Sequence, residues 1–233
     1  MSALPAPARR PYRGAPMEGR LARWYARQTR RLRPEFAAEA RDIAAQLAPG
    51  ARVLEVAPGP GYLAVELAKL GAFEIFGLDV SHSFVRIARD YAAKSGVKVE
   101  FRQGDAAAMP FGPDVFDFII SRAAFKNFGD PGGAIAEMRR VLRPGGQALI
   151  RDMRGDASNA ALDAAVSAMR LGPFATILNR FIFRQLRRRA YTSNALLRMA
   201  AASPFGGAEV HENDLGFDAV LRKPPPAQTD GPR

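Results

Sequence analysis

A glycine- and proline-rich turn joins an apolar segment to an amphipathic one near the start of the chain. Residues 53–56 have strand character and include Glu55, residues 57–61 read Ala-Pro-Gly-Pro-Gly, and residues 62–69 have helical spacing. Glycines at such a turn let the backbone bend sharply and let a ligand approach, because they have no Cβ. The turn therefore predicts a nucleoside-type ligand, with the Glu55 carboxylate facing the same crevice.

Two classes of ligand fit this turn. Gly59 to Ala64 match the dinucleotide pattern G-x-G-x-x-G/A, and Asp79 follows at the spacing of a ribose-binding acid. A dinucleotide, however, needs backbone N–H groups under its pyrophosphate. Pro60 removes one such donor, and Glu55 would repel the phosphates. A cationic cofactor without phosphate fits better, and S-adenosylmethionine has these properties in its sulfonium and amino groups.

Further segments follow in a characteristic order: a strand over 75–81, a loop over 101–111, a strand over 116–122 and a helix–turn–strand unit over 141–150. With the turn after residue 56, they resemble the class I S-adenosylmethionine-dependent methyltransferases (methyltransferase type 11). The similarity is greatest to the ubiquinone/menaquinone-biosynthesis C-methyltransferases and covers residues 20–223. One departure is Ala57, which replaces the usual first glycine of the loop. We expect Ala57 to have a negative φ, since a Cβ disfavours the left-handed region.

The resemblance implies an α/β fold. It is a Rossmann-like, seven-stranded, mostly parallel sheet with helices on both faces and an antiparallel last strand. We expect a mobile N-terminal tail at 1–16, one methyltransferase domain at 17–223 and a disordered tail at 224–233. Within the domain, the family implies cover helices over the cofactor at 17–50 and a helical lid or substrate region at 157–203.

The resemblance also assigns roles to residues of the cofactor site. Glu55 is expected to face the methionyl ammonium, Asp79 to accept from both ribose hydroxyls, and Asp105 to accept from the adenine amino group. A structural alternative stays open for each of them, as a helix cap for Glu55 and as turn acids for the two aspartates. The expected cofactor-binding residues are Glu55, Ala57, Gly59, Gly61, Tyr62, Asp79, Val80, Ser81, Phe84, Asp105, Ala106, Ser121 and Arg122.

Catalytic residues are harder to assign, because methyl transfer is an in-line displacement that mainly requires alignment. A general base is needed only if the acceptor must lose a proton. Lys126 and Asn127 stand where the quinone methyltransferases have Arg-Asn, and either could orient an acceptor or be structural. Asp152 and Tyr25 are the candidate bases. We expect no metal, and we interpret the two histidines, His82 and His211, as structural.

Composition narrows the alternatives. The chain has no cysteine, which excludes disulfides, thiolate zinc sites and cysteine-adduct mechanisms. The net charge is +11, and residues 51–150 hold only +1 of it, so the excess lies on the flanks. Such flanks can steer an acidic substrate or a nucleic acid, or they can be a solvated surface. No apolar run reaches the length of a membrane span, and we expect a cytoplasmic protein.

The acceptor is not fixed by the motifs. Residues 171–191 combine phenylalanines and aliphatic residues with arginines, which suits a lid over a hydrophobic small molecule, a membrane surface, an RNA backbone or ordinary packing. We therefore predict methyl transfer to a small, hydrophobic or aromatic acceptor at an O, N or C atom, with S-adenosylhomocysteine as the second product. The alternatives are an RNA methyltransferase and a non-catalytic cofactor-binding protein. A homodimer through residues 171–191 is a further hypothesis.

Overall fold

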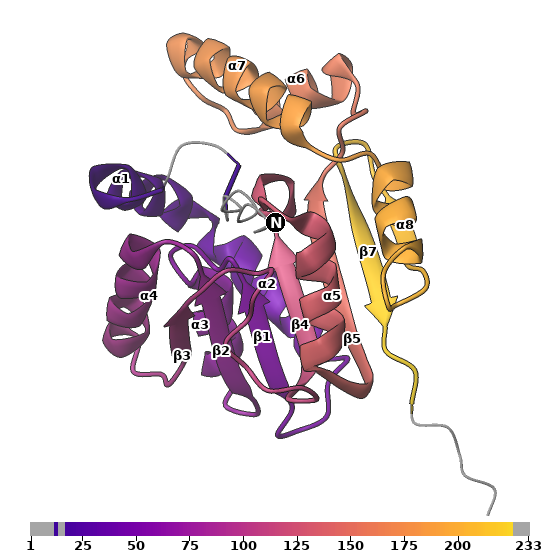
Figure 1. The fold of residues 1–233 in the computed structure, drawn as a ribbon. Coiled ribbons are helices and arrows are strands. Elements are labelled where there is room, and N and C mark those ends of the chain that lie inside the picture. Colours follow the sequence, from indigo (N-terminus) through magenta and orange to yellow (C-terminus); the bar gives the residue numbers. More distant parts are fainter. Residues whose placement is uncertain (1–11, 14–16, 226–233) are drawn as a thin grey trace, which may run out of the picture.

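The strands join into one sheet with the order β3-β2-β1-β4-β5-β7-β6 (Figure 1). The structure is a computed structural model that describes residues 12–13 and 17–225 of the 233-residue chain, so the two predicted tails lie largely outside the described residues. The strands of this described part are β1 (Arg52–Val56), β2 (Glu74–Asp79), β3 (Glu100–Gln103), β4 (Phe116–Arg122), β5 (Leu142–Met153), β6 (Glu209–Glu212) and β7 (Gly216–Arg222).

The predicted sheet is confirmed. β1 pairs in parallel with β2 and β4, and the outer pairs β2–β3 and β4–β5 are parallel too. β7 is antiparallel to both of its neighbours, β5 and β6. The carboxyl ends of β1, β2, β4 and β5 consequently meet at one edge of the sheet, where open α/β folds bind their ligands.

Helices cover both faces of the sheet. One apolar core packs α2, α3 and α4 against the face that carries Val53 and Phe118, and a second core packs α5 and α8 against the face that carries Leu54 and Ile119. Both faces are apolar, as parallel strands between two helix layers require. The helices are α1 (Gly19–Thr29), η1 (Arg30–Leu32), α2 (Arg33–Ala44), α3 (Tyr62–Lys69), α4 (His82–Lys94), η2 (Phe125–Asn127), α5 (Pro131–Val141), α6 (Asn159–Ala168), α7 (Pro173–Arg189) and α8 (Ser193–Ala201).

The expected negative φ at Ala57 is wrong. Ala57 has a φ of 59°, and its N–H donates to the carbonyl of Leu78 at the end of β2. This hydrogen bond holds the chain in a left-handed turn directly after β1. This conformation costs alanine about 1–2 kcal/mol of free energy, so the contacts of the turn outweigh the steric cost of a Cβ.

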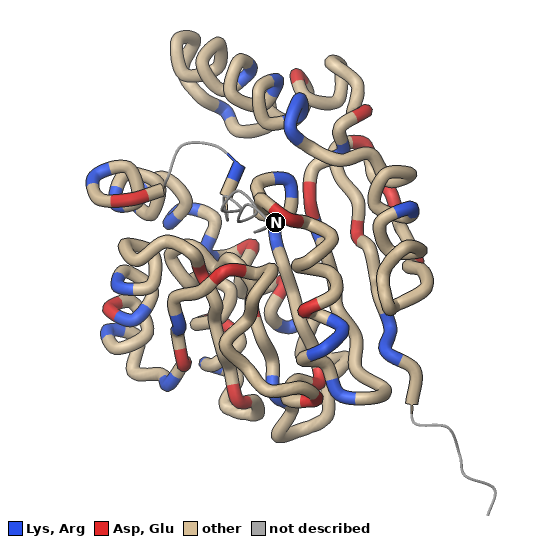
Figure 2. Tube along the Cα trace, viewed as in Figure 1, with Lys and Arg blue, Asp and Glu red and all other residues tan. Residues whose placement is uncertain are grey.

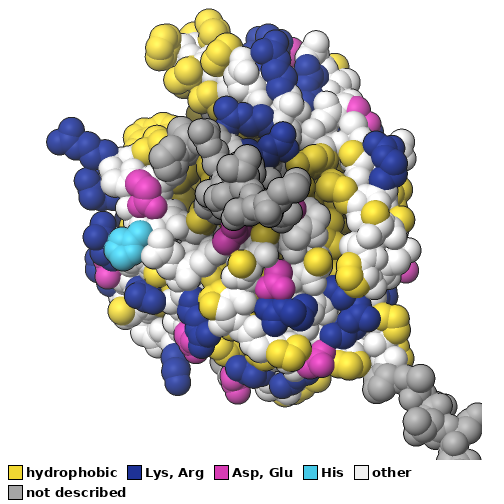
Figure 3. Space-filling view, in the orientation of Figure 1, with side chains coloured by type: hydrophobic (Ala, Val, Ile, Leu, Met, Phe, Trp, Pro, Cys, Tyr) yellow, Lys and Arg dark blue, Asp and Glu magenta, His cyan; other side chains and the backbone are white. Residues whose placement is uncertain are grey.

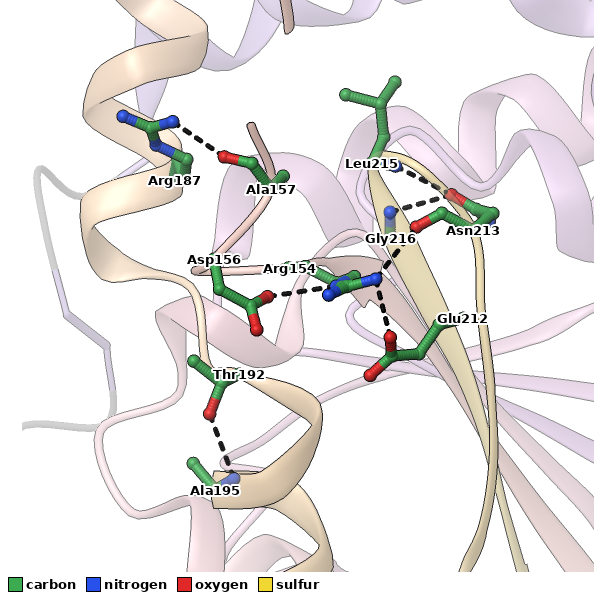
Figure 4. Close-up of polar contacts among 10 residues, drawn as sticks. All are labelled: Arg154, Asp156, Ala157, Arg187, Thr192, Ala195, Glu212, Asn213, Leu215 and Gly216. Carbon is green, nitrogen blue, oxygen red and sulfur yellow. Dashed lines mark hydrogen bonds and ion pairs between the residues drawn. The ribbon is translucent and has the colours of Figure 1, made fainter. Parts of the chain in front are cut away.

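The α6–α7 hairpin stands above the carboxyl edge of the sheet and is attached through a small polar junction (Figures 1 and 4). Arg154, just after β5, pairs with Asp156 and with Glu212 of β6. Arg187 of α7 donates to the carbonyl of Ala157 at 2.7 Å. A Cβ on Gly155 would lie 2.4 Å from the carbonyl oxygen of Ala190, so only glycine lets the chains entering and leaving the hairpin cross here.

Candidate functional site

Three predicted site residues meet at the carboxyl edge of the sheet. Glu55 is the fourth residue of β1, Asp79 ends β2 and Arg122 ends β4. Their charges interact with one another, since the charges of Arg122 and Asp79 both influence the pKa of Glu55. The topology therefore brings together side chains that are far apart in the sequence.

Glu55 is a buried carboxyl group with a strongly shifted pKa. One of its oxygens accepts the backbone N–H of Ala64 in α3 at 2.9 Å, and only 4% of the residue is exposed. Burial raises the pKa of Glu55 from 4.5 to about 8, and the Ala64 hydrogen bond and the Arg122 charge only partly oppose the shift. The side chain is therefore mostly protonated at pH 7, and a cation beside it would favour its charged form.

Asp79 links the glycine loop to the next helix. Its Oδ2 accepts the N–H of Gly59 at 2.9 Å, and its Oδ1 accepts the N–H of Ser81 at 2.8 Å. Burial raises the pKa of Asp79 to about 6, against the lowering effect of these two hydrogen bonds. Each carboxylate oxygen can accept a second hydrogen bond, so the side chain is still able to hold a pair of hydroxyl groups.

The two loop glycines have different surroundings. Both have a positive φ, 56° at Gly59 and 78° at Gly61. A Cβ on Gly61 would lie 2.8 Å from both Ala88 and Phe101, so Gly61 lets the start of α3 approach α4 and β3 closely. Apart from its two chain neighbours, no described residue has an atom within 4 Å of a Cβ placed on Gly59. Gly59 thus faces open space in the described part of the chain, as a glycine beneath a ligand would.

The start of α4 anchors the N-terminal helix beside Asp79. Ser81 caps α4 by accepting from the N–H of Phe84, and its hydroxyl donates to the carbonyl of Met17 at 2.7 Å. Ser83 accepts the N–H of Gly19 and donates its own N–H to Glu18. These bonds place α1 over the carboxyl edge. Ser81 therefore acts as the N-cap of α4 in this structure.

Aromatic contacts extend this cover. Tyr25 of α1 meets the buried ring of Phe84 edge to face at 5.7 Å. Tyr62 packs edge to face on Tyr91, and its hydroxyl donates to the carbonyl of Ala26 in α1 at 2.7 Å. The Tyr62 hydroxyl of α3 thus connects α3 to α1 through a hydrogen bond.

Asp105 forms a local turn in the loop after β3. Its Oδ1 accepts the N–H of Ala107 at 3.0 Å, and its carbonyl accepts the N–H of Ala108. Ala106 is half-buried against the α5-side core. Val80 is also half-buried, and its carbonyl accepts from Gln103 at the end of β3. These residues line the loop after β3, which the sequence analysis expects beside the adenine.

Glu39 is a site residue that the sequence analysis missed. It lies in α2 with 7% exposure, pairs with Arg122 at 2.7 Å and pairs with Arg151 of β5 at 2.7 Å. Arg151 also binds Asp218, and the hydrogen bonds raise the pKa of Arg151. A signal was available, because Glu39 interrupts the buried face of Phe36, Ala40 and Ile43 at helical spacing. A charged residue on such a face indicates a buried partner.

Lys126 and Asp152 form a buried ion pair. The Lys126 ammonium donates to Asp152 at 2.7 Å and to the carbonyl of Ala123 at 2.6 Å. Asp152 also accepts the backbone N–H groups of Lys126 and Met153. The side chains are 5% and 2% exposed. The sequence predicted the two residues as separate candidates, and the structure joins them in one pair.

Two tyrosines approach the edge from the N-terminal segment. Burial raises the pKa of Tyr12 and the pKa of Tyr25, and the charge of Asp79 contributes to both shifts. Nearby arginines, Arg189 for Tyr12 and Arg122 for Tyr25, oppose the shifts in part. Tyr12 also bridges to Phe128, and the N–H of Arg13 donates to the carbonyl of Asn127. The N-terminal segment therefore lies against the predicted Lys126-Asn127 loop.

The residues present fit S-adenosylmethionine. Buried carboxylates with raised pKa values suit a cationic ligand, and Gly59 leaves open space beside them. Ser121, fully buried near the end of β4, has a hydroxyl without a hydrogen-bond partner among the described residues. Such a group is expected where a ligand supplies the partner. Among the described residues no cluster of ligands for a metal occurs, and His82 and His211 are both exposed.

Comparison with known proteins agrees with this geometry. The methyltransferase domain model named Methyltransf_11 matches residues 54–150. Residues 54–150 thus have the sequence of a methyltransferase domain. The fold of this methyltransferase domain is shared with a Methanococcus maripaludis protein described as a candidate S-adenosyl-L-methionine-dependent methyltransferase, with a TM-score of 0.72, 22% identity and coverage of 91% of this chain and 95% of that one.

A curated relative matches the methyltransferase domain in sequence. The ubiquinone/menaquinone biosynthesis C-methyltransferase of a Marinomonas species is 37% identical over 94 residues, which are 39% of this chain and 38% of the relative. The chain thus spans well under half the length of this relative. The fold of the methyltransferase domain also occurs in the [4+2]-cyclase SpnF, with a TM-score of 0.59, 20% identity and coverage of 95% of this chain and 88% of that one. The fold alone therefore does not define a reaction.

Proposed function

We propose that this protein transfers a methyl group from S-adenosylmethionine to a small, hydrophobic or aromatic acceptor. The observation that carries the proposal is the pair of buried carboxyl groups, Glu55 and Asp79, around the open Gly59 turn. Burial raises the pKa of both groups, and a cation beside them would restore their charged form, so the pair suits a cationic ligand. The match of residues 54–150 to a methyltransferase domain supports the same cofactor.

Each residue of the pair has a separate role in cofactor binding. Asp79 holds the ribose hydroxyls with the acceptor sites that remain beside its bonds to Gly59 and Ser81. Glu55 faces the methionyl ammonium, directly or through water, and loses its proton when the cation binds. Arg122, near Glu55 and held by Glu39, supplies the cation for the methionyl carboxylate. Gly59, Ser121 and the Asp105 loop complete the walls.

When bound, S-adenosylmethionine supplies a methyl group that is already activated by its cationic sulfur, which leaves as a neutral thioether. The protein then has to align the acceptor and exclude water. α1 provides the cover, because Ser81 and Ser83 fix its first turn beside Asp79. Tyr12 and Tyr25 can each donate a hydrogen bond to the acceptor at neutral pH, because the tyrosine hydroxyl is protonated there and burial raises its pKa further.

The Lys126–Asp152 pair is proposed as a positioning element. Asp152 accepts from the Lys126 ammonium and from two backbone N–H groups, so it is poorly placed to remove a proton from an acceptor. The pair instead fixes the loop after β4, to which the Arg13 backbone is bound. We infer that the acceptor reacts without a strong carboxylate base. An electron-rich aromatic ring meets this condition, and the name of the Marinomonas relative, a C-methyltransferase of quinone biosynthesis, supports that class.

The proposal is tested with the purified full chain and a screen of acceptors. Release of S-adenosylhomocysteine should depend on both enzyme and acceptor, and hydrophobic phenols and quinols should give the highest rates. Transfer to bulk RNA with no reaction on small molecules would favour the RNA alternative. Micromolar binding of the cofactor with no methylated product from any acceptor would favour a non-catalytic binding protein.

A further inference from the structure

One face of α7 consists of exposed apolar side chains. Phe174 is 80% exposed, Ile177 68%, Leu178 46% and Phe181 60%. Their spacing of three and four residues puts them on the same side of the helix. In Figure 3 hydrophobic side chains cover the tip of the hairpin at the top of the molecule. No residue of α7 is fully buried, so this face is left without a partner in the described part of the chain.

Polar contacts on one flank of α7 hold the helix in the hairpin. Arg180 and Arg184 of α7 both reach Asp163 of α6 at 3.4 Å, and Arg187 binds the carbonyl of Ala157. α6 buries Leu162 and Val166. The hairpin is thus internally supported through one side of α7, and the apolar face is free for an external surface.

α7 itself carries only positive charge, and Asp163 of α6 pairs with two of its arginines. α7 contains five arginines, Arg180, Arg184, Arg187, Arg188 and Arg189, and no acidic residue. Arg188 is exposed and follows Phe181 by seven residues, so it continues the same stripe. Figure 2 shows this basic character along the hairpin. Guanidinium groups lie at the end of this apolar stripe and along its flank. A surface with an apolar interior and anionic headgroups is complementary to this arrangement.

α1 also combines exposed apolar side chains with arginines. Leu21 and Trp24 are exposed and lie three residues apart, on the same side of the helix. α1 contains Arg20, Arg23 and Arg27 and no acidic residue. Both helices lie at the carboxyl edge of the sheet, and Figure 3 shows hydrophobic and basic side chains over both of them. Two separate elements therefore present the same combination of chemistry on one side of the molecule.

We propose that α7, together with α1, docks this protein onto the surface of an anionic lipid bilayer. The phenylalanine and aliphatic side chains enter the headgroup region, while the arginines bind lipid phosphates at its rim. None of the described helices is long and apolar enough to cross a membrane, so the helices lie on the bilayer. The docking does not depend on methyl transfer. It would turn the carboxyl edge of the sheet, with the proposed cofactor site, toward the lipid.

Other occupants fit the surface less well. A second copy that packed its own α7 on this face would bring the exposed Arg188 and Arg189 of both copies together, which like-charge repulsion opposes. An RNA would satisfy the arginines through its phosphates but would leave the strongly exposed Phe174 and Phe181 without an apolar environment. A bilayer satisfies both features at once.

The test is sedimentation of the full chain with vesicles of phosphatidylcholine alone or mixed with phosphatidylglycerol. The protein should bind the mixed vesicles, and binding should weaken as salt rises. The double variant Phe174→Ser/Phe181→Ser, altered at exposed positions, should keep the melting temperature and bind at least about tenfold more weakly. Arg188→Gln should weaken binding to the mixed vesicles only.

A matched pair of leucines controls for general hydrophobicity. Leu178 on the α7 face and Leu70 after α3 have similar exposure, 46% and 41%. Leu178→Ser should weaken vesicle binding, and Leu70→Ser should leave it unchanged. The proposal would be overturned by equal binding to both vesicle types or by equal effects of the two leucine variants. It would also be overturned by a dimer in lipid-free solution that Phe174→Ser/Phe181→Ser dissociates. RNA that competes with the vesicles for the wild type, but not for the same double variant, would overturn the proposal too.

Discussion

The N–H of Gly59 donates to Oδ2 of Asp79 at 2.9 Å, across twenty residues of sequence. This hydrogen bond joins the turn after β1 to the acid at the end of β2, so the two halves of the proposed cofactor site hold one another in place. Because Asp79 is 5% exposed and also binds the N–H of Ser81, its position is set before any ligand arrives.

The two loop glycines should respond differently to alanine. Gly59→Ala should cost about 1–2 kcal/mol of stability, because only the positive φ is strained. It should also weaken cofactor binding, since its Cβ would enter the open space. Gly61→Ala should cost about 2–5 kcal/mol, because overpacking against Ala88 and Phe101 adds to the strain. Denaturant unfolding and calorimetric titration separate the two effects. Equal stability losses would contradict the different surroundings of the two positions.

The strand and turn segments of this site could be predicted from sequence, because glycine, proline and alternating polarity act locally. Asp79 and Glu55 were found from their place at strand ends. The pairing of Lys126 with Asp152 could not be found, since it depends on how the loop after β4 meets the end of β5. The left-handed φ of Ala57 was mispredicted, because its stabilising hydrogen bond comes from β2. Glu39 could have been noticed as a charge on an apolar helix face, but its partners on β4 and β5 could not be named from the sequence.

Glu55 should make stability depend on pH. The folded-state pKa is raised from 4.5 to about 8, so the folded protein keeps a proton that the unfolded chain loses between these values. The associated stability is fully present below about pH 4.5 and is lost as the pH rises through about 8. Glu55→Gln cannot ionise, so this variant should gain stability relative to wild type by several kcal/mol between pH 5 and pH 9, at about 1.4 kcal/mol per pKa unit. Thermal or denaturant unfolding of both proteins across this pH range gives the difference between their unfolding free energies. The contributions of the other titrating groups cancel in this difference. A constant difference would show that Glu55 has an ordinary pKa.

The same ionisation should couple to cofactor binding. Below about pH 8 a bound cation must displace the Glu55 proton, so affinity for S-adenosylmethionine should rise with pH between 6.5 and 8, by up to tenfold per pH unit. Calorimetry at pH 7 in buffers of different ionisation enthalpy should detect proton release. Glu55→Gln should bind more weakly and release no proton from this position. Binding of the wild type that is independent of pH and buffer would place the cation away from Glu55.

The Lys126–Asp152 pair should be strongly coupled in stability. Lys126→Met leaves the Asp152 charge buried without its cation, and a loss of about 3–5 kcal/mol is expected for breaking a buried pair. Asp152→Asn should cost a similar amount, because it leaves the ammonium buried. The double variant should lose clearly less than the sum of the two single losses. A double-mutant cycle of unfolding free energies measures this coupling. Additive losses would mean that the two charges do not stabilise one another.

The most direct measurement is titration calorimetry of the full chain with S-adenosylmethionine, S-adenosylhomocysteine and NAD, for wild type and Asp79→Ala. The wild type should bind the first two at micromolar concentrations and should not bind NAD. Asp79→Ala should bind at least about 100-fold more weakly, since it loses two charge-assisted hydrogen bonds of about 1.5–3 kcal/mol each. Binding of NAD alone, or cofactor affinity unchanged in Asp79→Ala, would contradict the proposed site.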